Sequence, residues 1–337
     1  MMNKRIDFID LAKGICILLV ILAHCGVSMN YPGLQTIQMP LFFILSGFFL
    51  KDYGGFARFI IQKTNRLLLP FLFFYLTGYV VFYLLKYFAP SILKTDANGI
   101  MDVFTQRQYF NGPIWFLLCL FWTNVMFCAI SLNVRKEWVR ACIVLCLGLF
   151  GAFLGLKEVI LPCMIDVALT AFPFFYFGYI LKKTPLLYKN KNDKYNLLFA
   201  LLLYSIAFAF SLWFDSPYIG FHANHIVGNI PVIYIISITS VMAILYLCKI
   251  VGRLPFLSYF GRYSIIPLCV HHLIYRPVKL VMMHFGMDNV LALSVITVLL
   301  SWACIPLCIK YIPYFTAQKD LIKIAQANHD SDSLKNV

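Results

Sequence analysis

Charged residues are scarce in this sequence. Only 12% of its 337 residues are Asp, Glu, Lys or Arg, whereas about 25% is usual in a soluble domain. Hydrophobic residues make up 61% of the chain, against roughly 45–50% in such domains. This composition excludes a soluble globular protein. Because each membrane-crossing helix needs about 20 mostly apolar residues, the chain has enough apolar sequence for around ten crossings.

The sequence also lacks internal repeats, low-complexity tracts and cysteines grouped with histidines as metal ligands. Most of the 11 cysteines lie inside apolar runs, which favours packing over disulfides, and we expect no metal. The apolar runs do not alternate with period two, so helices rather than barrel strands are predicted. The formal charge of +14 lies in short segments between apolar runs, which argues for a membrane-lipid environment and against a nucleic-acid partner.

Ten apolar windows are long enough to cross, or nearly cross, a bilayer. We therefore predict an all-α polytopic membrane protein with about ten transmembrane helices. Its integral membrane domain covers 5–312, and its polar end, 313–337, is expected to be cytoplasmic and disordered. The windows lie at about 11–29, 36–50, 67–89, 113–132, 138–156, 159–181, 195–214, 229–251, 263–284 and 289–312.

The distribution of Lys and Arg predicts the orientation. If alternate connections are assigned to one side, that side collects 22 of the 28 basic residues and the other side 6. Basic residues are enriched on the cytoplasmic side of membrane proteins. We therefore expect both termini in the cytoplasm, a connection at 182–194 inside, and a connection at 90–112 outside.

The first apolar window contains two ionisable residues, Lys13 and His24. Such residues cost a few kcal/mol inside a bilayer, so each needs a reason to be there. Eleven helical residues correspond to a rotation of about 20° beyond three turns and a rise of about 16 Å, which places both side chains on one face. Lys13 could simply extend to the lipid headgroups and His24 could be a packed core residue. Their alignment instead indicates a buried polar path.

Further ionisable residues lie in later windows. Asp166 is expected near the depth of His24, where a carboxylate could orient an imidazole or simply pair with a basic neighbour. His271 and His272 point about 100° apart on one helix, so at most one is expected on a given face and the other at a helix interface. The histidines of DSPYIGFHANH, residues 215–225, have no cysteine or carboxylate beside them, which favours a solvated loop over a metal site.

A basic connection at 51–66 precedes the third window. Lys63 and Arg66 are three residues apart and would share a helix face at the cytoplasmic surface, where they could bind phosphates. A connection on the cytoplasmic side is basic in any case, so the pattern is also explained without a ligand.

Five stretches, in order over about 5–285, together resemble the membrane acyltransferase-3 family, in particular its fucose-4-O-acetylase-like members. In the first, the family has a basic residue and a histidine separated by ten residues, which match Lys13 and His24; the family more often has Arg at the first position. In the last, His271 matches the family histidine. The stretches are RIDFIDLAKGICILLVILAH, MPLFFILSGFF, FARFIIQKTNRLLLPF, NGPIWFLLCLFW and GRYSIIPLCVHHLI.

The resemblance implies an O-acetyltransferase that moves an acetyl group from cytoplasmic acetyl-CoA to a carbohydrate hydroxyl of the cell envelope. It places the protein in a bacterial-type inner membrane. Lys13, Lys63 and Arg66 would bind the coenzyme A phosphates, and His24 would act as general base or accept the acetyl group. His271 and Asp166 complete the expected catalytic set, while Ser46 and Asn111 are candidate oxyanion donors.

The main alternative is a multipass transporter or exporter of a polysaccharide or lipid-linked sugar, which also needs buried ionisable residues. Transporters of this kind often show a pseudo-repeat and matched spans broken by Gly or Pro. The sequence shows neither, so the enzyme is the favoured hypothesis.

Overall fold

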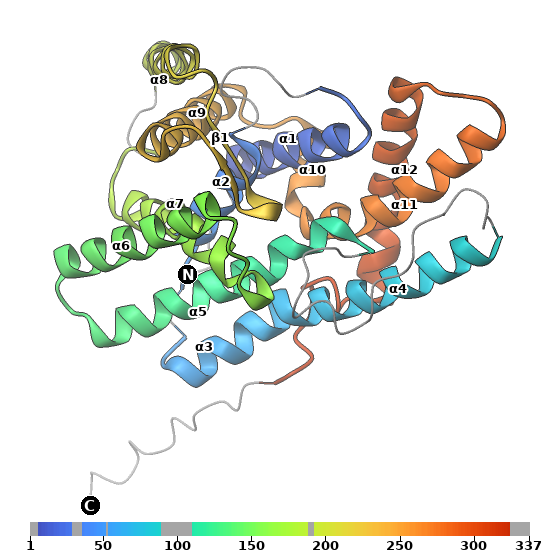
Figure 1. The fold of residues 1–337 in the computed structure, drawn as a ribbon, viewed down its shortest axis with the longest axis horizontal. Coiled ribbons are helices and arrows are strands. Elements are labelled where there is room, and N and C mark those ends of the chain that lie inside the picture. The colour runs from blue at the N-terminus through green and yellow to red at the C-terminus, as the bar shows by residue number, and fades with distance from the viewer. Residues whose placement is uncertain (1–5, 29–35, 52, 89–109, 188–191, 324–337) are drawn as a thin grey trace, which may run out of the picture.

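The computed structural model describes residues 6–28, 36–51, 53–88, 110–187 and 192–323, and its elements are almost all helices (Figure 1). Two short strands, β1 (Tyr218–Gly220) and β2 (His225–Val227), form an antiparallel hairpin. The helices are α1 (Asp7–His24), α2 (Gln38–Phe48), α3 (Phe56–Lys63), α4 (Leu69–Phe88), α5 (Trp115–Asn133), α6 (Glu137–Leu156), α7 (Ile165–Lys183), α8 (Asp193–Trp213), α9 (Ile230–Val251), α10 (Pro255–Arg262), α11 (Ile265–His284) and α12 (Val290–Tyr311).

Every predicted apolar window contains a helix, so the all-α membrane fold is confirmed. Among the described residues, eight helical segments are long and apolar enough to cross a membrane. The other two windows give α1, which has 18 residues and carries Asp7, Asp10 and Lys13, and α2, which has 11 residues. The sequence pattern locates these elements because a helix in lipid must satisfy its own backbone hydrogen bonds along one continuous apolar segment.

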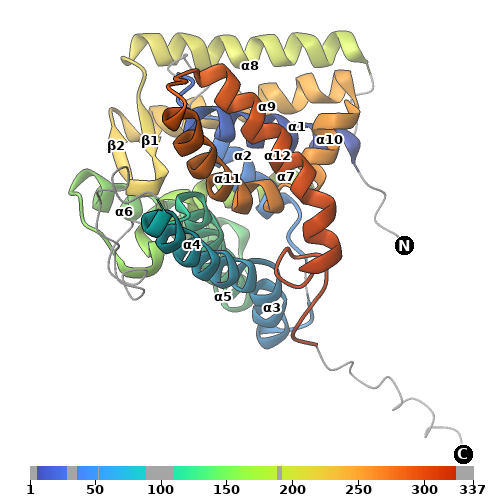
Figure 2. The same cartoon turned by 90° about the vertical axis from the view of Figure 1, so that its right-hand side faces the viewer.

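The helices differ in how deeply they are buried. In α7, 67% of the apolar window is buried and in α5 61%, but in α8 only 22%. α8 packs mainly on α9, α2 packs on α7, α1 on α10 and α11 on α12. Figures 1 and 2 accordingly show α8 along one edge of the bundle. The residues of α1 and α11 that carry the candidate site thus lie in helices held by several neighbours.

Glycines allow α2 and α7 to approach each other closely. A Cβ atom built on Gly178 would lie 1.8 Å from the Ile44 carbonyl oxygen, and one built on Gly47 would lie 1.9 Å from the Phe175 carbonyl oxygen. Helices in membranes commonly pack through such small residues, because lipid offers little hydrophobic driving force for association.

We expect Gly178→Ala to destabilise the protein by about 1–3 kcal/mol or more, because the added methyl group forces two backbones apart. The measurement is the midpoint of thermal unfolding of purified protein in detergent. Gly220→Ala is the control, since its Cβ would meet nothing closer than 3.5 Å. Equal midpoints for wild type and Gly178→Ala would contradict the close packing of α2 on α7.

The segment expected as a connection at 51–66 is largely helical. It contains α3 and continues through a π-helical turn, Thr64–Leu68, directly into α4. A short amphipathic helix with only Phe59 buried has too little apolar sequence to be recognised as a membrane window. In addition, the three-residue spacing that predicts a common face for Lys63 and Arg66 applies to an α-helix, whereas a π turn has i→i+5 hydrogen bonds.

The segment that carries His222 and His225 is not a solvated loop throughout. It forms the β1–β2 hairpin, whose connecting residue Asn224 is 1% exposed. The Asn224 side chain donates to the Gly151 carbonyl oxygen at 3.0 Å and accepts from the Thr170 hydroxyl at 2.8 Å. The two histidines themselves are exposed, as expected. The sequence does not predict the hairpin, because the hydrogen bonds that order it join it to Gly151 of α6 and Thr170 of α7.

The first part of the predicted disordered end, 313–323, packs against the start of α4. The Phe315 and Phe73 rings stack with centroids 4.4 Å apart, and the Asn65 side chain accepts hydrogen bonds from the Leu321 and Ile322 amides at 3.1 and 2.9 Å. This part of the segment is therefore ordered. Residues 324–337 lie outside the described residues.

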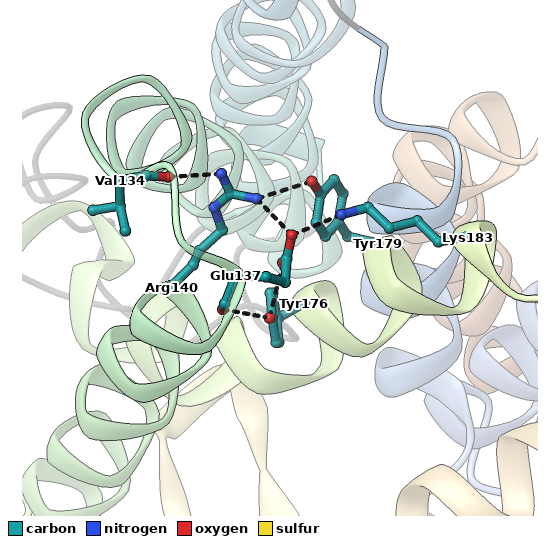
Figure 3. A network of polar contacts seen from close by, with 6 residues as sticks. All are labelled: Val134, Glu137, Arg140, Tyr176, Tyr179 and Lys183. Atoms are coloured by element: carbon teal, nitrogen blue, oxygen red, sulfur yellow. Dashed lines mark hydrogen bonds and ion pairs between the residues drawn. The ribbon is translucent and has the colours of Figure 1, made fainter.

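A polar network joins the start of α6 to the end of α7 (Figure 3). Glu137 accepts from Arg140 at 3.0 Å and from Lys183 at 2.7 Å, and Arg140 also contacts the Tyr179 hydroxyl at 3.0 Å. Arg140 is only 7% exposed. The structure gives its guanidinium a carboxylate, a hydroxyl and a carbonyl partner, as burial of a charge requires.

Candidate active site

Three histidines from two helices meet in this structure. His24 is the last residue of α1, while His271 and His272 lie in the first half of α11. The His24 ring centroid lies 5.3 Å from that of His271 and 4.6 Å from that of His272. One ring nitrogen of each lies within 4.8 Å of the others, and the described residues contain no other such cluster of three His, Cys, Asp or Glu side chains.

Both members of the histidine pair lie next to His24, although at most one of them is expected on a given face of α11. Adjacent helical residues point about 100° apart. The end of α1 lies between these two directions, so both rings reach the same imidazole. The angle of about 100° between His271 and His272 therefore does not determine which of them contacts His24 on α1.

The hydrogen bonds give the two neighbours of His24 different roles. His272 Nε2 lies 3.3 Å from His24 Nδ1, and His271 Nδ1 donates to the Pro267 carbonyl oxygen at 2.7 Å, one turn earlier in α11. In the tautomer in which His24 donates its Nδ1–H to His272, the Nε2 lone pair of His24 is left to accept a proton. His272 would then orient His24 as the third member of a catalytic triad orients its histidine.

His24 opens onto a cavity of about 590 Å³, which we call the histidine cavity. Its volume falls within the roughly 300–1,000 Å³ of small-molecule sites. The cavity lies between α1, α4 and α11 and is mostly apolar and aromatic. Its lining residues are His24, Gly78, Val81, Phe82, Leu85, Phe110, His272, Leu273, Tyr275, Arg276, Lys279, Leu280 and Met283.

Lys13 and Lys63 line a second cavity of about 240 Å³, which we call the lysine cavity. The Lys13 Nζ lies 5.1 Å from the centre of the Phe49 ring, and the Lys63 Nζ lies 5.2 Å from the centre of the Phe59 ring. The resemblance implies that Lys13, Lys63 and Arg66 bind the coenzyme phosphates, and two of the three, Lys13 and Lys63, line this cavity. At this volume, below the range of typical ligand sites, the cavity can hold only part of a large coenzyme.

The two cavities are lined by successive parts of the same pair of helices, α1 and α11. Lys13 and Ser264 line the lysine cavity, whereas His24 and His272 line the histidine cavity. α1 and α11 therefore run in the same direction between them, and the rise along α1 from Lys13 to His24 is about 16 Å. The common face of Lys13 and His24 stays a prediction from helix geometry.

Arg66 is not among the residues that line the lysine cavity. Its guanidinium binds the Ala317 carbonyl oxygen and forms an ion pair with Asp320 at 3.1 Å. The structure thus separates Arg66 from the two lysines and uses it to hold the 313–323 segment. Its assignment to coenzyme binding stays a prediction.

The remaining predicted site residues, Asp166, Ser46 and Asn111, are not part of the three-histidine cluster. Asp166 is fully buried in the first turn of α7 and is not part of the histidine cluster. Ser46 lines the lysine cavity and accepts a hydrogen bond from Asn124 at 3.3 Å. Asn111 is fully buried and donates to the Cys269 carbonyl oxygen at 2.7 Å, so it braces α11 beside the histidine pair. Their catalytic roles stay predictions.

Sequence reasoning missed Arg276 and Lys279 as site residues. Both belong to the six basic residues assigned to the outer side of the membrane, yet both line the histidine cavity. The signal was present in the sequence, because positions 272, 276 and 279 follow the i, i+4, i+7 spacing of one helix face.

The three imidazoles also form the only set of side chains in the described residues that could hold a metal ion. Zinc needs nitrogens at about 2.0–2.1 Å, and His271 already donates through Nδ1 to a carbonyl, as metal-binding histidines often do. The ligand nitrogens are up to 4.8 Å apart and would have to move closer together. The prediction that the protein uses no metal is therefore left to experiment. All eleven cysteines are free.

Comparison with known proteins identifies a family. The family described as an acyltransferase domain of the acyltransferase-3 type matches residues 6–307, which is nearly the whole chain. No curated protein and no solved structure matches the chain.

Proposed function

The chain belongs to the acyltransferase-3 family and is a membrane acyltransferase, and from this premise we propose that it is an O-acetyltransferase acting on an envelope carbohydrate. In this proposal the acetyl donor is acetyl-CoA at the cytoplasmic face, and the acceptor is a sugar hydroxyl, as in the fucose-4-O-acetylase-like members that the sequence resembles. The reaction modifies an exported or surface polysaccharide.

The observation that carries the proposal is the position of His24. Its ring is exposed to a cavity of ligand size, and its Nδ1 is held by His272. A general base needs a positioned ring with one nitrogen free toward the substrate, and this arrangement leaves Nε2 for that purpose. The lysine cavity, which Lys13 of α1 lines together with Lys63, supplies the cations that a coenzyme with phosphate groups requires.

In the proposed step, the sugar hydroxyl gives its proton to His24 Nε2 as its oxygen forms a bond to the acetyl carbon. The carbon–sulfur bond of the thioester then breaks, and the coenzyme A thiolate leaves and takes up the proton. If His24 instead accepts the acetyl group, its Nε2 first bonds to the acetyl carbon as the carbon–sulfur bond breaks and coenzyme A leaves. The sugar oxygen then bonds to the same carbon as the carbon–nitrogen bond breaks, and the released imidazole takes up the hydroxyl proton. No metal is required in either case.

We expect Lys63→Ala to raise the KM for acetyl-CoA about 10-fold while changing kcat little, because a charged hydrogen bond is worth about 1.5–3 kcal/mol. A phosphate contact far from the reacting carbon is made equally in the ground and transition states, so it affects KM. Steady-state kinetics with varied acetyl-CoA measure this effect.

Two further variants test the assignment of the lysine cavity. Lys13→Arg should be tolerated, because it keeps the charge. Arg66→Ala tests the third predicted coenzyme residue. Because its guanidinium binds Asp320 and the Ala317 carbonyl oxygen and does not line the cavity, we expect it to raise the KM for acetyl-CoA less than Lys63→Ala does. A loss of kcat alone in Lys63→Ala would show that Lys63 does not bind the coenzyme.

The orientation is part of the proposal, because the coenzyme is cytoplasmic. We expect a reporter domain fused in the 182–194 connection to be inside and one fused in the 90–112 connection to be outside, given the 22 to 6 distribution of basic residues. Alkaline phosphatase and green fluorescent protein fusions measure this. An outside signal at 182–194 would place the lysine cavity on the side without acetyl-CoA.

The experiment that tests the function uses membranes that contain the full chain. They are incubated with acetyl-CoA labelled in the acetyl group and with the envelope glycans of the host. We expect label in a carbohydrate fraction, released by mild base as an ester is. Membranes with His24→Ala should give no label above background. Label that stays on coenzyme A in both samples would overturn the proposal.

A further inference from the structure

Two basic side chains point to the chemistry of the acceptor. Arg276 and Lys279 lie one and two turns beyond His272 on the same face of α11, and all three line the histidine cavity. The rise from His272 to Arg276 is about 6 Å, which is comparable to the width of a sugar ring. A ligand at Arg276 can therefore also reach the histidines.

Among the residues that the structure describes, Arg276 has no acidic partner. None of the residues that line the histidine cavity is Asp or Glu, and the ion pairs of the described residues do not include Arg276. This contrasts with Arg140, which is buried with a carboxylate, a hydroxyl and a carbonyl partner. An ionised group within a membrane span is costly, and those that occur are usually paired or functional.

Lys279 provides the comparison on the same helix. It is exposed, and its Nζ contacts only the Tyr275 hydroxyl at 3.4 Å among the described residues, as expected for a lysine that extends toward the headgroups. Arg276 is only partly exposed and faces the cavity. Unlike Lys279, Arg276 therefore does not owe its position to an extension toward the headgroups, and it lines the same cavity as His24 and His272.

We propose that the acceptor carries an oxyanion, a phosphate or a carboxylate, which Arg276 binds in the histidine cavity with Lys279 beside it. This inference rests on the proposed acyltransferase function and names the acceptor class. The guanidinium fork matches either oxyanion with two parallel hydrogen bonds. Binding the anion one turn from His272 places a hydroxyl of the attached sugar next to His24. The apolar and aromatic lining receives the remainder of the acceptor.

The test is a binding measurement on purified full-length protein in nanodiscs of phosphatidylcholine. The probes are three labelled sugars with the same ring: glucose, glucuronic acid and glucose 1-phosphate. We expect one or both anionic sugars to bind at least about 10-fold more tightly than glucose, as the loss of a charge-assisted pair predicts. The comparison of glucuronic acid with glucose 1-phosphate identifies the oxyanion. Equal binding of all three sugars, or no binding, overturns the proposal.

Variants then locate the binding site. Arg276→Gln should remove the preference for the anionic sugar, and Arg276→Lys should retain part of it, since a lysine keeps the charge but lacks the fork. Lys157→Gln is the matched control, because Lys157 is an exposed cation that does not line the cavity. An unchanged preference in Arg276→Gln overturns the assignment.

Nanodiscs that contain phosphatidylglycerol separate an acceptor from a lipid headgroup. If the anionic lipid abolishes the binding of the anionic sugar to the wild type, the site binds headgroups and the proposal is overturned. Sugar binding does not require acetyl transfer. Its failure therefore leaves the acyltransferase function, tested by labelling with acetyl-CoA, unaffected.

Discussion

Acetyl transfer by the His24→Ala variant is expected to fall by about 10²-fold or more, the usual effect of removing a positioned base. The same loss is expected if His24 accepts the acetyl group, because the substitution removes the nucleophile. Folding and insertion should be retained, since the removal of a polar side chain does not hinder entry into lipid. The measurement is acetyl transfer per unit of purified, monodisperse protein.

His284→Ala is the matched control for this experiment. His284 is an exposed histidine at the end of α11 and lies outside the three-histidine cluster. It should keep wild-type turnover. Near-normal turnover in His24→Ala would remove the catalytic assignment and favour a transporter, in which this histidine would be one polar group along a path.

Substitution of His272 should have the next largest effect. We expect His272→Phe to lower kcat by about 10- to 100-fold with little change in KM, because the orienting partner of His24 Nδ1 is lost. His272→Gln should recover part of the activity, since its carbonyl oxygen can accept the same hydrogen bond. Steady-state kinetics on the three proteins measure this difference.

His271→Ala distinguishes an orienting role from a structural one. The His271 ring donates within its own helix to Pro267 and does not hydrogen-bond His24, so we expect a smaller loss of kcat and mainly a loss of stability. If both variants lose activity equally and the wild type contains stoichiometric zinc by mass spectrometry, the three histidines bind a metal ion instead.

Much of the architecture could be predicted because it depends on local sequence. A membrane-crossing helix is one continuous apolar segment, so its position can be recognised without knowledge of its neighbours. The common face of Lys13 and His24 could be predicted for the same reason, since both lie on one helix and only helix geometry is involved.

Elements stabilised by distant residues could not be predicted in this way. The β1–β2 hairpin depends on Asn224, which accepts a hydrogen bond from the Thr170 hydroxyl and donates one to the Gly151 carbonyl oxygen. The 313–323 segment depends on Asn65 and Arg66, which lie about 250 positions earlier. The hairpin and the 313–323 segment contain no apolar window, so their sequences cannot be told from those of polar connections.

The sequence alone determined that the chain is a helical membrane protein and that one helix carries a cation and a histidine on the same face. Only the tertiary structure decided which residues surround that histidine. His272 and His24 are separated by 248 positions in the chain, and their contact depends on how α1 and α11 pack. The tertiary structure also pairs Arg66 with Asp320, whereas Lys63 lines the lysine cavity, and it places Arg276 in the wall of the histidine cavity. Periodicity along one helix defines its faces, but only helix packing determines what each face meets.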